Sequence, residues 1–398
     1  MLYGYYFRLY GVFHNEKISI YLAYILRFIK SISFWFKKFT HKKRIVRTDV
    51  SEAGKTVNSV YPKPEFQKPI YINNKTNDSV DLSIIVPVYN YAELIEKNIN
   101  SILNQKTKYR FEAIFVDDGS TDGARDILDK YRTCKNVKVI YQQNMGIAGA
   151  RNTGINNAVG KYIMFVDCDD TVLDNIVESL MDKAYSDDCD IVMCAHELVK
   201  EKDGKVLSVI PNIYPDSKYM GMKRREGIIN YAGLPWCKVY KRELFENVRF
   251  FPGYWYEDTI VQFLLFTQCR KFAYVKNIGY EYKWYENNFS HVQNNSKNSK
   301  TIDRYWLLID IIEQYEKIGL PKDKLFYELL IKHLSVYYLP SIAGLGNEVV
   351  DALFVLANDL LIKYRPKEKI KLPYMLRIIE KAILDKDINL WKLAAKYC

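Results

Sequence analysis

The sequence contains an Asp-x-Asp pattern, Asp167-Cys168-Asp169, followed by a further acid at Asp170. The apolar run before it, residues 163–166, predicts a buried strand that delivers these carboxylates to the rim of a sheet. Carboxylate oxygens suit Mg²⁺ and Mn²⁺, and Mg²⁺ is usually held by one or two carboxylates together with substrate phosphates. One carboxylate could therefore face a ribose and the other a metal that bridges a diphosphate. A solvated turn with a helix cap is the structural alternative.

A second acidic cluster, Asp117-Asp118-Gly119-Ser120, follows another apolar run. A strand that ends in two carboxylates and a glycine turn can offer acceptors to the N–H of uracil and the hydroxyls of ribose. The same residues also fit a turn followed by a helix N-cap, because Asp and Ser both cap helices. Taken alone, this cluster favours the structural interpretation.

A third acidic pair, Glu257-Asp258, opens a predicted helix after the aromatic stretch 250–256. A carboxylate near a bound sugar can take a proton from an acceptor hydroxyl. Acids in the first turn of a helix also complement the helix dipole, so this pair is a weak signal when it is considered alone.

Small residues occupy positions 146 and 148–150, directly before Arg151. They allow a helix start to approach a ligand closely, and Arg151 could then reach a phosphate. Tight packing of a helix on a sheet requires the same small residues, so that interpretation stays open. The segment is neither a Walker loop nor a GxGxxG dinucleotide fingerprint.

These clusters lie along a regular alternation of predicted strands and helices. Strands are expected at residues 82–88, 111–116, 137–141, 162–166 and 190–196, and helices at 92–103, 122–132, 147–158 and 175–186. Such alternation predicts an α/β fold with a mainly parallel sheet. Ligands of parallel sheets bind at the carboxyl ends of the strands, where the acidic clusters at 117–120 and 167–170 stand.

Beyond residue 200 the pattern is less regular. It predicts a hairpin at 200–211, a helix at 256–269 and a strand at 271–284. Mostly helices follow, at about 301–318, 323–339, 347–363 and 373–385.

Composition and charge narrow the class of protein. The chain has 398 residues and seven cysteines without C-x-x-C spacing, which argues against a zinc site and favours free thiols in a reducing cytosol. Its net charge of +11 is unevenly distributed along the chain. Residues 1–47 contain ten Lys and Arg and one acidic residue, and residues 361–398 contain ten Lys and Arg and four acidic residues. The mildly acidic centre argues against nucleic-acid binding, whereas the basic ends could face an anionic surface.

No segment of the sequence is apolar over the roughly 20 residues that cross a membrane. Residues 17–39 instead predict a basic amphipathic helix with one apolar stripe, formed by Ile18, Leu22, Ile25, Ile29, Ile32, Phe36 and Phe39. Such a helix can lie in a lipid interface, or it can dock on the protein itself. A second stripe, formed by Leu372, Leu376, Ile379 and Ile383, could add another membrane contact.

Taken together, the motifs resemble the family 2 glycosyltransferases with the GT-A fold. The resemblance covers about residues 81–290 and rests on 83–90 (SIIVPVYN), 101–105 (SILNQ), 117–122 (DDGSTD), Asn144 with Gly146, 150–154 (ARNTG), 167–170 (DCDD), 234–244 (LPWCKVYKREL) and Glu257-Asp258. It implies a nucleotide-diphosphate-sugar donor, a UDP-sugar by family habit, together with Mn²⁺ or Mg²⁺ and inversion at the anomeric carbon. The acceptor would be a saccharide or a lipid-linked glycan of a bacterial surface polysaccharide.

The resemblance also implies a role for each matching residue. Pro87, Tyr89 and Asn90 would line the nucleotide pocket, Asp118 would contact the base, Arg151 would lie near the phosphates and Asp167 would face the ribose or donor. Asp169 would bind the metal, Asp258 would be the general base, and Glu257 and Trp236 would lie on the acceptor side. The membrane helices and Gln-x-x-Arg-Trp motif of processive synthases are missing from the sequence, which favours single sugar addition.

Two other functions are weighed. A nucleotidyltransferase would usually carry a glycine-rich start after the first strand, where this chain has residues 86–90 (VPVYN). An inactive scaffold at a membrane is disfavoured by the intact acids at positions 118, 167, 169 and 258.

The expected organisation follows from these assignments. Residues 1–47 form the basic amphipathic segment, 48–80 a linker, 81–300 the GT-A domain and 301–398 a helical region. Within the GT-A domain, 81–196 would bind the nucleotide and 197–300 the acceptor. The expected location is the cytoplasm, at the inner face of the cell membrane.

Overall fold

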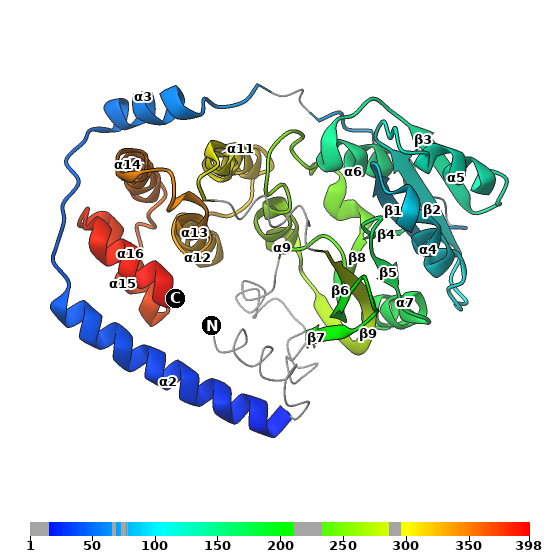
Figure 1. Ribbon diagram of the computed structural model, residues 1–398, viewed down its shortest axis with the longest axis horizontal. Helices are drawn as coiled ribbons and strands as arrows, with labels where there is room; N and C mark the ends of the chain where they lie inside the picture. The colour runs from blue at the N-terminus through cyan, green and yellow to red at the C-terminus, as the bar shows by residue number, and fades with distance from the viewer. Residues whose placement is uncertain (1–15, 66–68, 73–76, 78, 211–232, 286–295) are drawn as a thin grey trace. The chain divides into compact units, whose positions relative to one another are not determined.

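The computed structural model describes residues 16–65, 69–72, 77, 79–210, 233–285 and 296–398 (Figure 1). The chain divides into two compact units. The sheet unit comprises residues 66–253 and 257–286, and the helical unit comprises 1–65, 254–256 and 287–398. Residues 254–256, in the middle of the sheet unit's sequence, therefore belong to the helical unit.

Among the residues that the structure describes, the sheet unit is built on one nine-stranded sheet in the order β3-β2-β1-β4-β8-β6-β9-β5, with β7 paired to β6. Its strands are β1 (Leu82–Val88), β2 (Phe111–Asp117), β3 (Val137–Tyr141), β4 (Tyr162–Phe165), β5 (Thr171–Val172), β6 (Ile191–Lys200), β7 (Val206–Ile210), β8 (Lys238–Lys241) and β9 (Phe272–Trp284). The neighbours β3, β2, β1 and β4 are all parallel, whereas β8 is antiparallel to β4 and β6. The expected α/β fold with a mainly parallel centre is confirmed.

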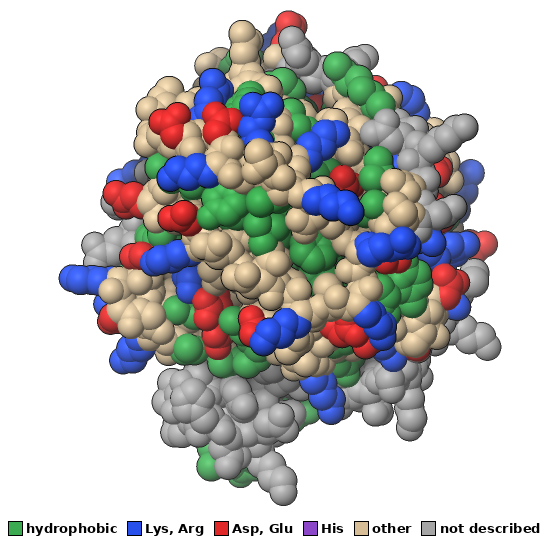
Figure 2. Space-filling model, turned by 90° about the vertical axis from the view of Figure 1, so that its right-hand side faces the viewer, with side chains coloured by type: hydrophobic (Ala, Val, Ile, Leu, Met, Phe, Trp, Pro, Cys, Tyr) green, Lys and Arg blue, Asp and Glu red, His purple; other side chains and the backbone are tan. Residues whose placement is uncertain are grey.

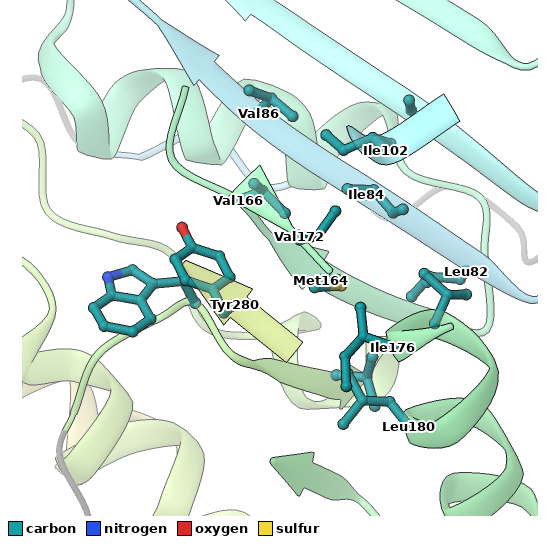
Figure 3. Close-up of a cluster of buried hydrophobic side chains, with 14 of the residues drawn as sticks. Leu82, Ile84, Val86, Ile102, Met164, Val166, Val172, Ile176, Leu180 and Tyr280 are labelled. Atoms are coloured by element: carbon teal, nitrogen blue, oxygen red, sulfur yellow. The ribbon is translucent and has the colours of Figure 1, made fainter. Parts of the chain in front are cut away.

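Helices cover both faces of the parallel strands. Helices α4 (Ala92–Leu103), α5 (Ala124–Tyr131) and α7 (Ile176–Ser186) contribute to one buried cluster with the even-numbered residues of β1. Figure 3 shows Ile84 of β1 and Ile102 of α4 in this cluster, with Ile176 of α7 nearby. Because both faces of β1 are covered, all of its seven residues are buried, as is usual for strands of a parallel sheet.

Helix α6 (Gly146–Asn157) packs against the odd-numbered face of β1, and one glycine makes this approach possible. A Cβ atom on Gly154 would lie 2.2 Å from Cγ2 of Ile85, which no side chain tolerates without a shift. The small residues of the segment therefore serve helix–sheet packing at least at this position.

The remaining elements of the sheet unit follow α7 along the chain. A 3₁₀ turn, η3 (Arg242–Phe245), follows β8, and a π-helical turn, η4 (Val261–Leu265), continues into α9 (Phe266–Gln268). The predicted hairpin is present in β6 and β7, which pair antiparallel. Residues 211–232, inside the expected acceptor half, lie outside the described part of the chain.

The helical unit contains more helices than the sequence predicts. They are α2 (Glu16–Thr40), α3 (Val50–Val60), η5 (Ser299–Ile302), α11 (Asp303–Lys317), α12 (Lys324–His333), α13 (Tyr338–Ile342), α14 (Asn347–Lys363), α15 (Tyr374–Leu384) and α16 (Ile388–Tyr397). Residues 50–60, expected in a linker, form α3, whose N-cap Asp49 accepts a hydrogen bond from the Glu52 amide. The helix expected at 323–339 is divided into α12 and α13.

Helix α2 leaves most of its predicted apolar stripe exposed. It docks through a narrow face, on which Ala23 and Phe34 are buried, and Ser33 hydrogen-bonds the Tyr397 hydroxyl at 3.0 Å. The exposed stripe residues are Ile18, Ile25, Ile29, Ile32, Phe36 and Phe39, joined by Tyr21, Tyr24, Leu26, Phe28 and Trp35. Within the described residues, no helix has the length and apolar character needed to cross a bilayer.

The second apolar stripe faces the interior. Leu372, Leu376, Ile379 and Ile383 are all buried in the helical unit, so the prediction that they contact a membrane is wrong. Periodicity locates the apolar face of a helix, but it does not show what that face covers.

Charge is mixed on the face of the molecule that Figure 2 presents. Viewed from the side on which Figure 1 places α5, Lys and Arg side chains are interspersed with Asp and Glu. This distribution matches a centre whose charges nearly balance in the sequence.

Candidate active site

The parallel register brings the acidic clusters to one edge of the sheet. Val88, the last residue of β1, pairs with Asp117 at the end of β2, and Ile85 of β1 pairs with Phe165 at the end of β4. The segments that follow these three strands therefore leave the sheet side by side. This confirms the expectation that the clusters at 117–120 and 167–170 stand at the carboxyl ends of their strands.

The two acids at the end of β2 have different surroundings. Asp117 is fully buried and accepts hydrogen bonds from Arg125 at 3.0 Å and from the Ser120 amide at 3.2 Å, so it holds the turn. Asp118 accepts hydrogen bonds through Oδ1 from Gln142 Nε2 at 2.6 Å and the Met145 amide at 2.8 Å. Burial raises the pKa of Asp118. Its contact with a base stays a prediction.

The predicted nucleotide-pocket residues after β1 are not equivalent. Asn90 adopts a left-handed φ of 56°, and its Oδ1 accepts a hydrogen bond of 2.8 Å from the Thr121 amide. This bond ties the end of β1 to the turn after β2. Tyr89 is 46% exposed and is accessible to a ligand.

Pro87 is buried inside β1. The Val88 carbonyl accepts from Asp118 on the β2 side, and the Ile85 carbonyl accepts from Val166 on the β4 side. Successive residues of a strand turn their backbone groups to opposite sides, so the Pro87 nitrogen faces β4, at a point beyond the last residue of that strand. No ladder hydrogen bond is lost there, which explains why a proline is tolerated in this strand.

The three acids after β4 also divide by role. Asp170 is fully buried and accepts hydrogen bonds from the Tyr280 hydroxyl at 2.7 Å and the Lys283 amide at 2.8 Å. It is a structural residue. Asp167 accepts a hydrogen bond of 2.8 Å from Arg151, and Asp169 is partly buried.

The Asp-x-Asp turn is supported by a residue that sequence reasoning missed. Asn98 of α4 is buried, and its Nδ2 donates to the carbonyl oxygens of Asp167 and Asp170, both at 2.9 Å. A polar residue on the apolar side of the predicted helix 92–103 was the available signal. The Tyr280 hydroxyl adds a third support by accepting from the Asp167 amide at 3.1 Å.

Arg151 connects two of the acidic clusters. Its side chain is 2% exposed, Nη2 donates to Asp167 Oδ1 at 2.8 Å, and Nη1 donates to Glu257 Oε1 at 2.7 Å. Burial alone would lower the pKa of Arg151, but the Asp167 and Glu257 carboxylates outweigh it, so the pKa is raised. The structure thus places the guanidinium between two carboxylates, and its contact with phosphate stays a prediction.

The segment after Glu257 carries the candidate base. The Asp258 carbonyl accepts a hydrogen bond of 2.9 Å from the Val261 amide at the start of η4. Lys238 of β8 is buried, and Nζ donates to the carbonyl oxygens of Leu234 at 2.6 Å and Trp236 at 3.2 Å. Burial lowers the pKa of Lys238 to about 8, although its neighbours Cys237, Cys194 and, least, Asp258 act to raise it.

Trp236 is packed between aromatic neighbours. It is 6% exposed, and its ring stacks on Tyr280 with centroids 4.8 Å apart and on Tyr282 at 5.4 Å. His196 meets its ring edge-on at 4.8 Å. The structure therefore gives Trp236 a packing role, and its expected position on the acceptor side stays a prediction.

The Asp-x-Asp carboxylates fit a divalent cation. Burial, reinforced by the charge of Asp167, raises the pKa of Asp169 to about 7. In the part of the chain that the structure describes, no Lys or Arg pairs with Asp169, and no group of three or more His, Cys, Asp or Glu could hold a metal. One or two protein carboxylates can hold Mg²⁺ when the phosphates of a bound substrate supply further oxygen ligands.

A cavity of about 430 Å³ lies elsewhere in the sheet unit. Its lining includes Lys161 and Tyr162 at the start of β4 and Arg242 just after β8. Because these residues mark the amino end of β4, the cavity is remote from the carboxylates at the other end of that strand.

Comparison with known proteins is consistent with this geometry. Residues 83–249 match the family described as Glycosyl transferase family 2. The chain is 31% identical over 212 residues to the glycosyltransferase GlyG of Streptococcus pneumoniae, covering 51% of this chain and 70% of GlyG. It is 28% identical over 245 residues to the uncharacterized glycosyltransferase YibD of Escherichia coli K12, and the match covers 58% of this chain and 70% of YibD.

The fold also resembles a solved structure. Residues 1–349 of Staphylococcus aureus TarS, in complex with UDP-GlcNAc, superpose with a TM-score of 0.60 and 20% sequence identity. The alignment covers 80% of this chain and 91% of that one. At 20% sequence identity, this similarity shows that the two proteins share a fold.

Proposed function

The chain belongs to glycosyltransferase family 2, and we propose that it transfers a sugar from a UDP-sugar to a hydroxyl of a glycan or lipid-linked glycan, with inversion and with a divalent metal. The sugar would be a hexose or N-acetylhexosamine, added once per acceptor in the biosynthesis of a surface polysaccharide. The TarS complex with UDP-GlcNAc supports the choice of donor by likeness of fold.

One observation carries the proposal. Arg151 binds Asp167 and Glu257 with hydrogen bonds of 2.8 and 2.7 Å, so the donor-side turn and the segment of the candidate base are held at a common point. A transferase needs this proximity, because the acceptor hydroxyl and the anomeric carbon must approach within bonding reach.

In the proposed reaction, the donor lies across the carboxyl ends of β1, β2 and β4. Asp118 accepts from the base, Tyr89 lies beside the nucleotide, and Asp167 faces the ribose or sugar. Asp118 is suited to hold one orientation, because Gln142 and the Met145 amide fix its Oδ1.

Asp258 takes the proton from the acceptor hydroxyl as the oxygen attacks the anomeric carbon. The new carbon–oxygen bond forms while the bond from that carbon to the β-phosphate oxygen breaks, and UDP leaves with the electron pair. Attack from the face opposite the leaving group inverts the configuration. A carboxylate is an effective base here only if its position is fixed within hydrogen-bond reach of the hydroxyl.

Asp169, with Asp167 beside it, would hold Mn²⁺ or Mg²⁺. Such an ion would act as a Lewis acid that offsets the negative charge developing on the diphosphate. The absence of a basic partner for Asp169 among the described residues leaves its carboxylate available for this role.

The proposed acceptor suggests a membrane location, and α2 supports it. Its exposed stripe combines aliphatic and aromatic residues, among them Phe36 at 71% and Phe39 at 91% exposure. Residues 1–47 carry ten Lys and Arg against one acid, so charge and apolar surface coincide. An anionic lipid surface matches both properties, and we propose that α2 lies in it at the cytoplasmic face.

Donor screening tests the function. The protein would be incubated with UDP-glucose, UDP-galactose, UDP-GlcNAc, UDP-GalNAc, GDP-mannose and a dTDP-sugar, with Mn²⁺ or with EDTA, and nucleotide release measured. We expect hydrolysis of one UDP-sugar that requires the metal. Metal-independent release, or release of pyrophosphate in place of UDP, would contradict the proposal.

A further inference from the structure

The turn that precedes β8 packs directly against the backbone of the candidate base. It comprises residues 233–237, and both this turn and the Glu257-Asp258 pair belong to the sheet unit. A Cβ atom added to Gly233 would lie 3.3 Å from the Asp258 carbonyl oxygen and 3.0 Å from Cγ of Gln262. The two segments are therefore so close that a single methyl group on the turn would press on the segment of Asp258.

Two side chains of β8 bind three consecutive carbonyl oxygens of this turn. Lys238 Nζ donates to the carbonyl oxygens of Leu234 at 2.6 Å and Trp236 at 3.2 Å. The Tyr240 hydroxyl donates to the carbonyl oxygen between them, that of Pro235, at 2.9 Å. Lys238 and Tyr240 are both buried, and buried backbone carbonyls need such partners because water does not reach them. The two side chains therefore fix the path of residues 234–236.

The last residue of the turn has an unusual backbone conformation. Cys237 has a φ of +60°, in the left-handed region that residues other than glycine rarely adopt. Such a conformation persists only where the surroundings enforce it, and it tends to occur at functional sites. Here the Cys237 carbonyl accepts a hydrogen bond of 3.0 Å from the Cys194 amide of β6, and the neighbouring Trp236 ring stacks on Tyr280. The turn is thus held from both sides in one conformation.

A buried lysine is a costly residue with which to hold a turn. Burial is the main influence on Lys238 and lowers its pKa to about 8, although Cys237, Cys194 and, least, Asp258 act to raise it. At neutral pH the ammonium group is therefore kept charged in surroundings that disfavour the charge. Groups kept at such a cost to stability tend to lie at functional sites, where they serve the reaction and not the fold alone.

We propose that Lys238 and Tyr240 are positioning residues for catalysis: they hold the turn 233–237 in the conformation on which the Asp258 backbone rests, and so set where the Asp258 carboxylate stands. The inference rests on the proposed role of Asp258 as the base. Lys238 and Tyr240 touch no reacting atom and act only through the turn. Proton transfer is sensitive to such positioning, because a misplacement of about 1 Å can cost on the order of a hundredfold in rate.

The main test is Tyr240→Phe, which removes only the hydroxyl that binds the Pro235 carbonyl. Activity would be measured as metal-dependent UDP release from the UDP-sugar that the donor screen identifies, with water in place of the acceptor hydroxyl, and UDP affinity by calorimetry with Mn²⁺. We expect kcat to fall several-fold while UDP affinity stays within about twofold, because the proposed donor contacts follow β1, β2 and β4. Tyr162→Phe is the matched control: its buried hydroxyl, in the same unit, donates to the Cys189 carbonyl at 3.0 Å at the amino end of β4.

Two further variants approach the turn in other ways. Lys238→Met keeps the length of the side chain but deprives two carbonyls of their donor, and we expect kcat to fall about tenfold at similar UDP affinity. Lys332→Met is its control, because burial also lowers the pKa of Lys332, which lies in the helical unit.

Gly233→Ala removes no hydrogen-bonding side chain and only crowds the Asp258 segment. We expect a several-fold loss of kcat, again with UDP affinity within about twofold. Gly54→Ala is the control, since a Cβ atom added there meets nothing within 4 Å.

Asp258→Asn is measured in the same assay to separate the two proposals. If it is impaired while Tyr240→Phe and Gly233→Ala match their controls, the inference about the turn is wrong and the base assignment stands. If Asp258→Asn is as active as the unchanged protein, both fall. A parallel loss of UDP affinity and kcat in the turn variants would also overturn the inference, because it would indicate a general structural defect.

Discussion

Arg151 and Glu257 are joined by a hydrogen bond of 2.7 Å although 106 residues separate them in the sequence. The same guanidinium binds Asp167 at 2.8 Å, so one buried cation neutralises carboxylates from two functional segments. Glu257, which is 8% exposed, could not be buried at this low cost without it, because an uncompensated charge is expensive to remove from water.

Replacing this cation should therefore destabilise the sheet unit. Arg151→Met leaves two carboxylates without their partner, and we expect a loss of about 3 to 5 kcal/mol of unfolding free energy in urea denaturation. Adding Glu257→Gln to Arg151→Met should recover part of this loss, since it removes one of the orphaned charges. Strictly additive effects of the two substitutions would argue against the coupling.

Asp258→Asn tests the base. The amide keeps the size of the side chain but cannot accept a proton, so kcat should fall by a factor of about 100 or more. Donor affinity should stay within about threefold, because a base acts only as the acceptor loses its proton. Equal losses of donor binding and turnover would instead assign Asp258 to the donor site.

Asp169→Ala tests the metal site. We expect the variant to lose transfer and the Mn²⁺-dependent part of UDP binding while its melting temperature changes little, because the residue stands in a turn at the rim of the sheet. Asp174→Ala is the matched control: it removes an exposed carboxylate five positions further along. Activity of Asp169→Ala that persists in EDTA would exclude the proposed role.

Helix α2 can be tested without deleting it. Replacing Phe28 and Phe36, both more than 60% exposed, by Glu should abolish co-sedimentation with anionic vesicles at low salt. Ile362→Glu, at a site 55% exposed on α14, is the control and should bind like the unchanged protein. High salt should release the unchanged protein as well, because each basic residue contributes only about 1 kcal/mol and is screened. Binding by the Phe variants equal to that of the control would show that the stripe serves another purpose.

Lys238 makes a pH-dependent contribution to stability. Burial lowers its pKa from 10.5 to about 8, so the unfolded chain holds this proton more tightly than the folded protein. The charge of Lys238 therefore opposes folding below pH 8, and this cost is lost as pH rises from 8 toward 10.5.

Measured in urea at pH 7 and pH 9.5, the unchanged protein should gain about 2 kcal/mol relative to Lys238→Met. Groups that titrate alike in both proteins, such as the tyrosines, cancel in this difference. If the difference in unfolding free energy between the unchanged protein and Lys238→Met does not depend on pH, the lowered pKa of Lys238 is wrong.

The repeating part of the fold could be predicted because periodicity specifies it. The expected limits of β1, β3, α4 and α14 agree with the structure, since apolar runs and amphipathic spacing were unbroken there. Helix α3 was missed because its buried residues, Ala53 and Val57, form only one short apolar row in a polar segment. Its stability comes from packing on α14, which the local sequence does not contain.

The candidate site was predictable to a similar degree. Strand ends could be located, so the placement of Asp118 and Asp167 after strands that end at one edge of the sheet followed from the parallel register. The bridge from Arg151 to Glu257 could not be predicted, because it depends on a tertiary contact across 106 residues. Asn98 was missed for the same reason: its two carbonyl partners lie about 70 positions further along the chain.

Because the chain enters the helical unit for residues 254–256 and then returns to the sheet unit, the two units cannot be inherited as consecutive modules. A fragment that ends after β9 would keep Tyr254, Trp255 and Tyr256 but lose α11, leaving three aromatic side chains without the surface that buries them. Exposed apolar clusters of this kind favour aggregation. A recombination event that exchanged the C-terminal helices between related genes would have to carry this tripeptide as well, so the two stretches are expected to have changed together during evolution.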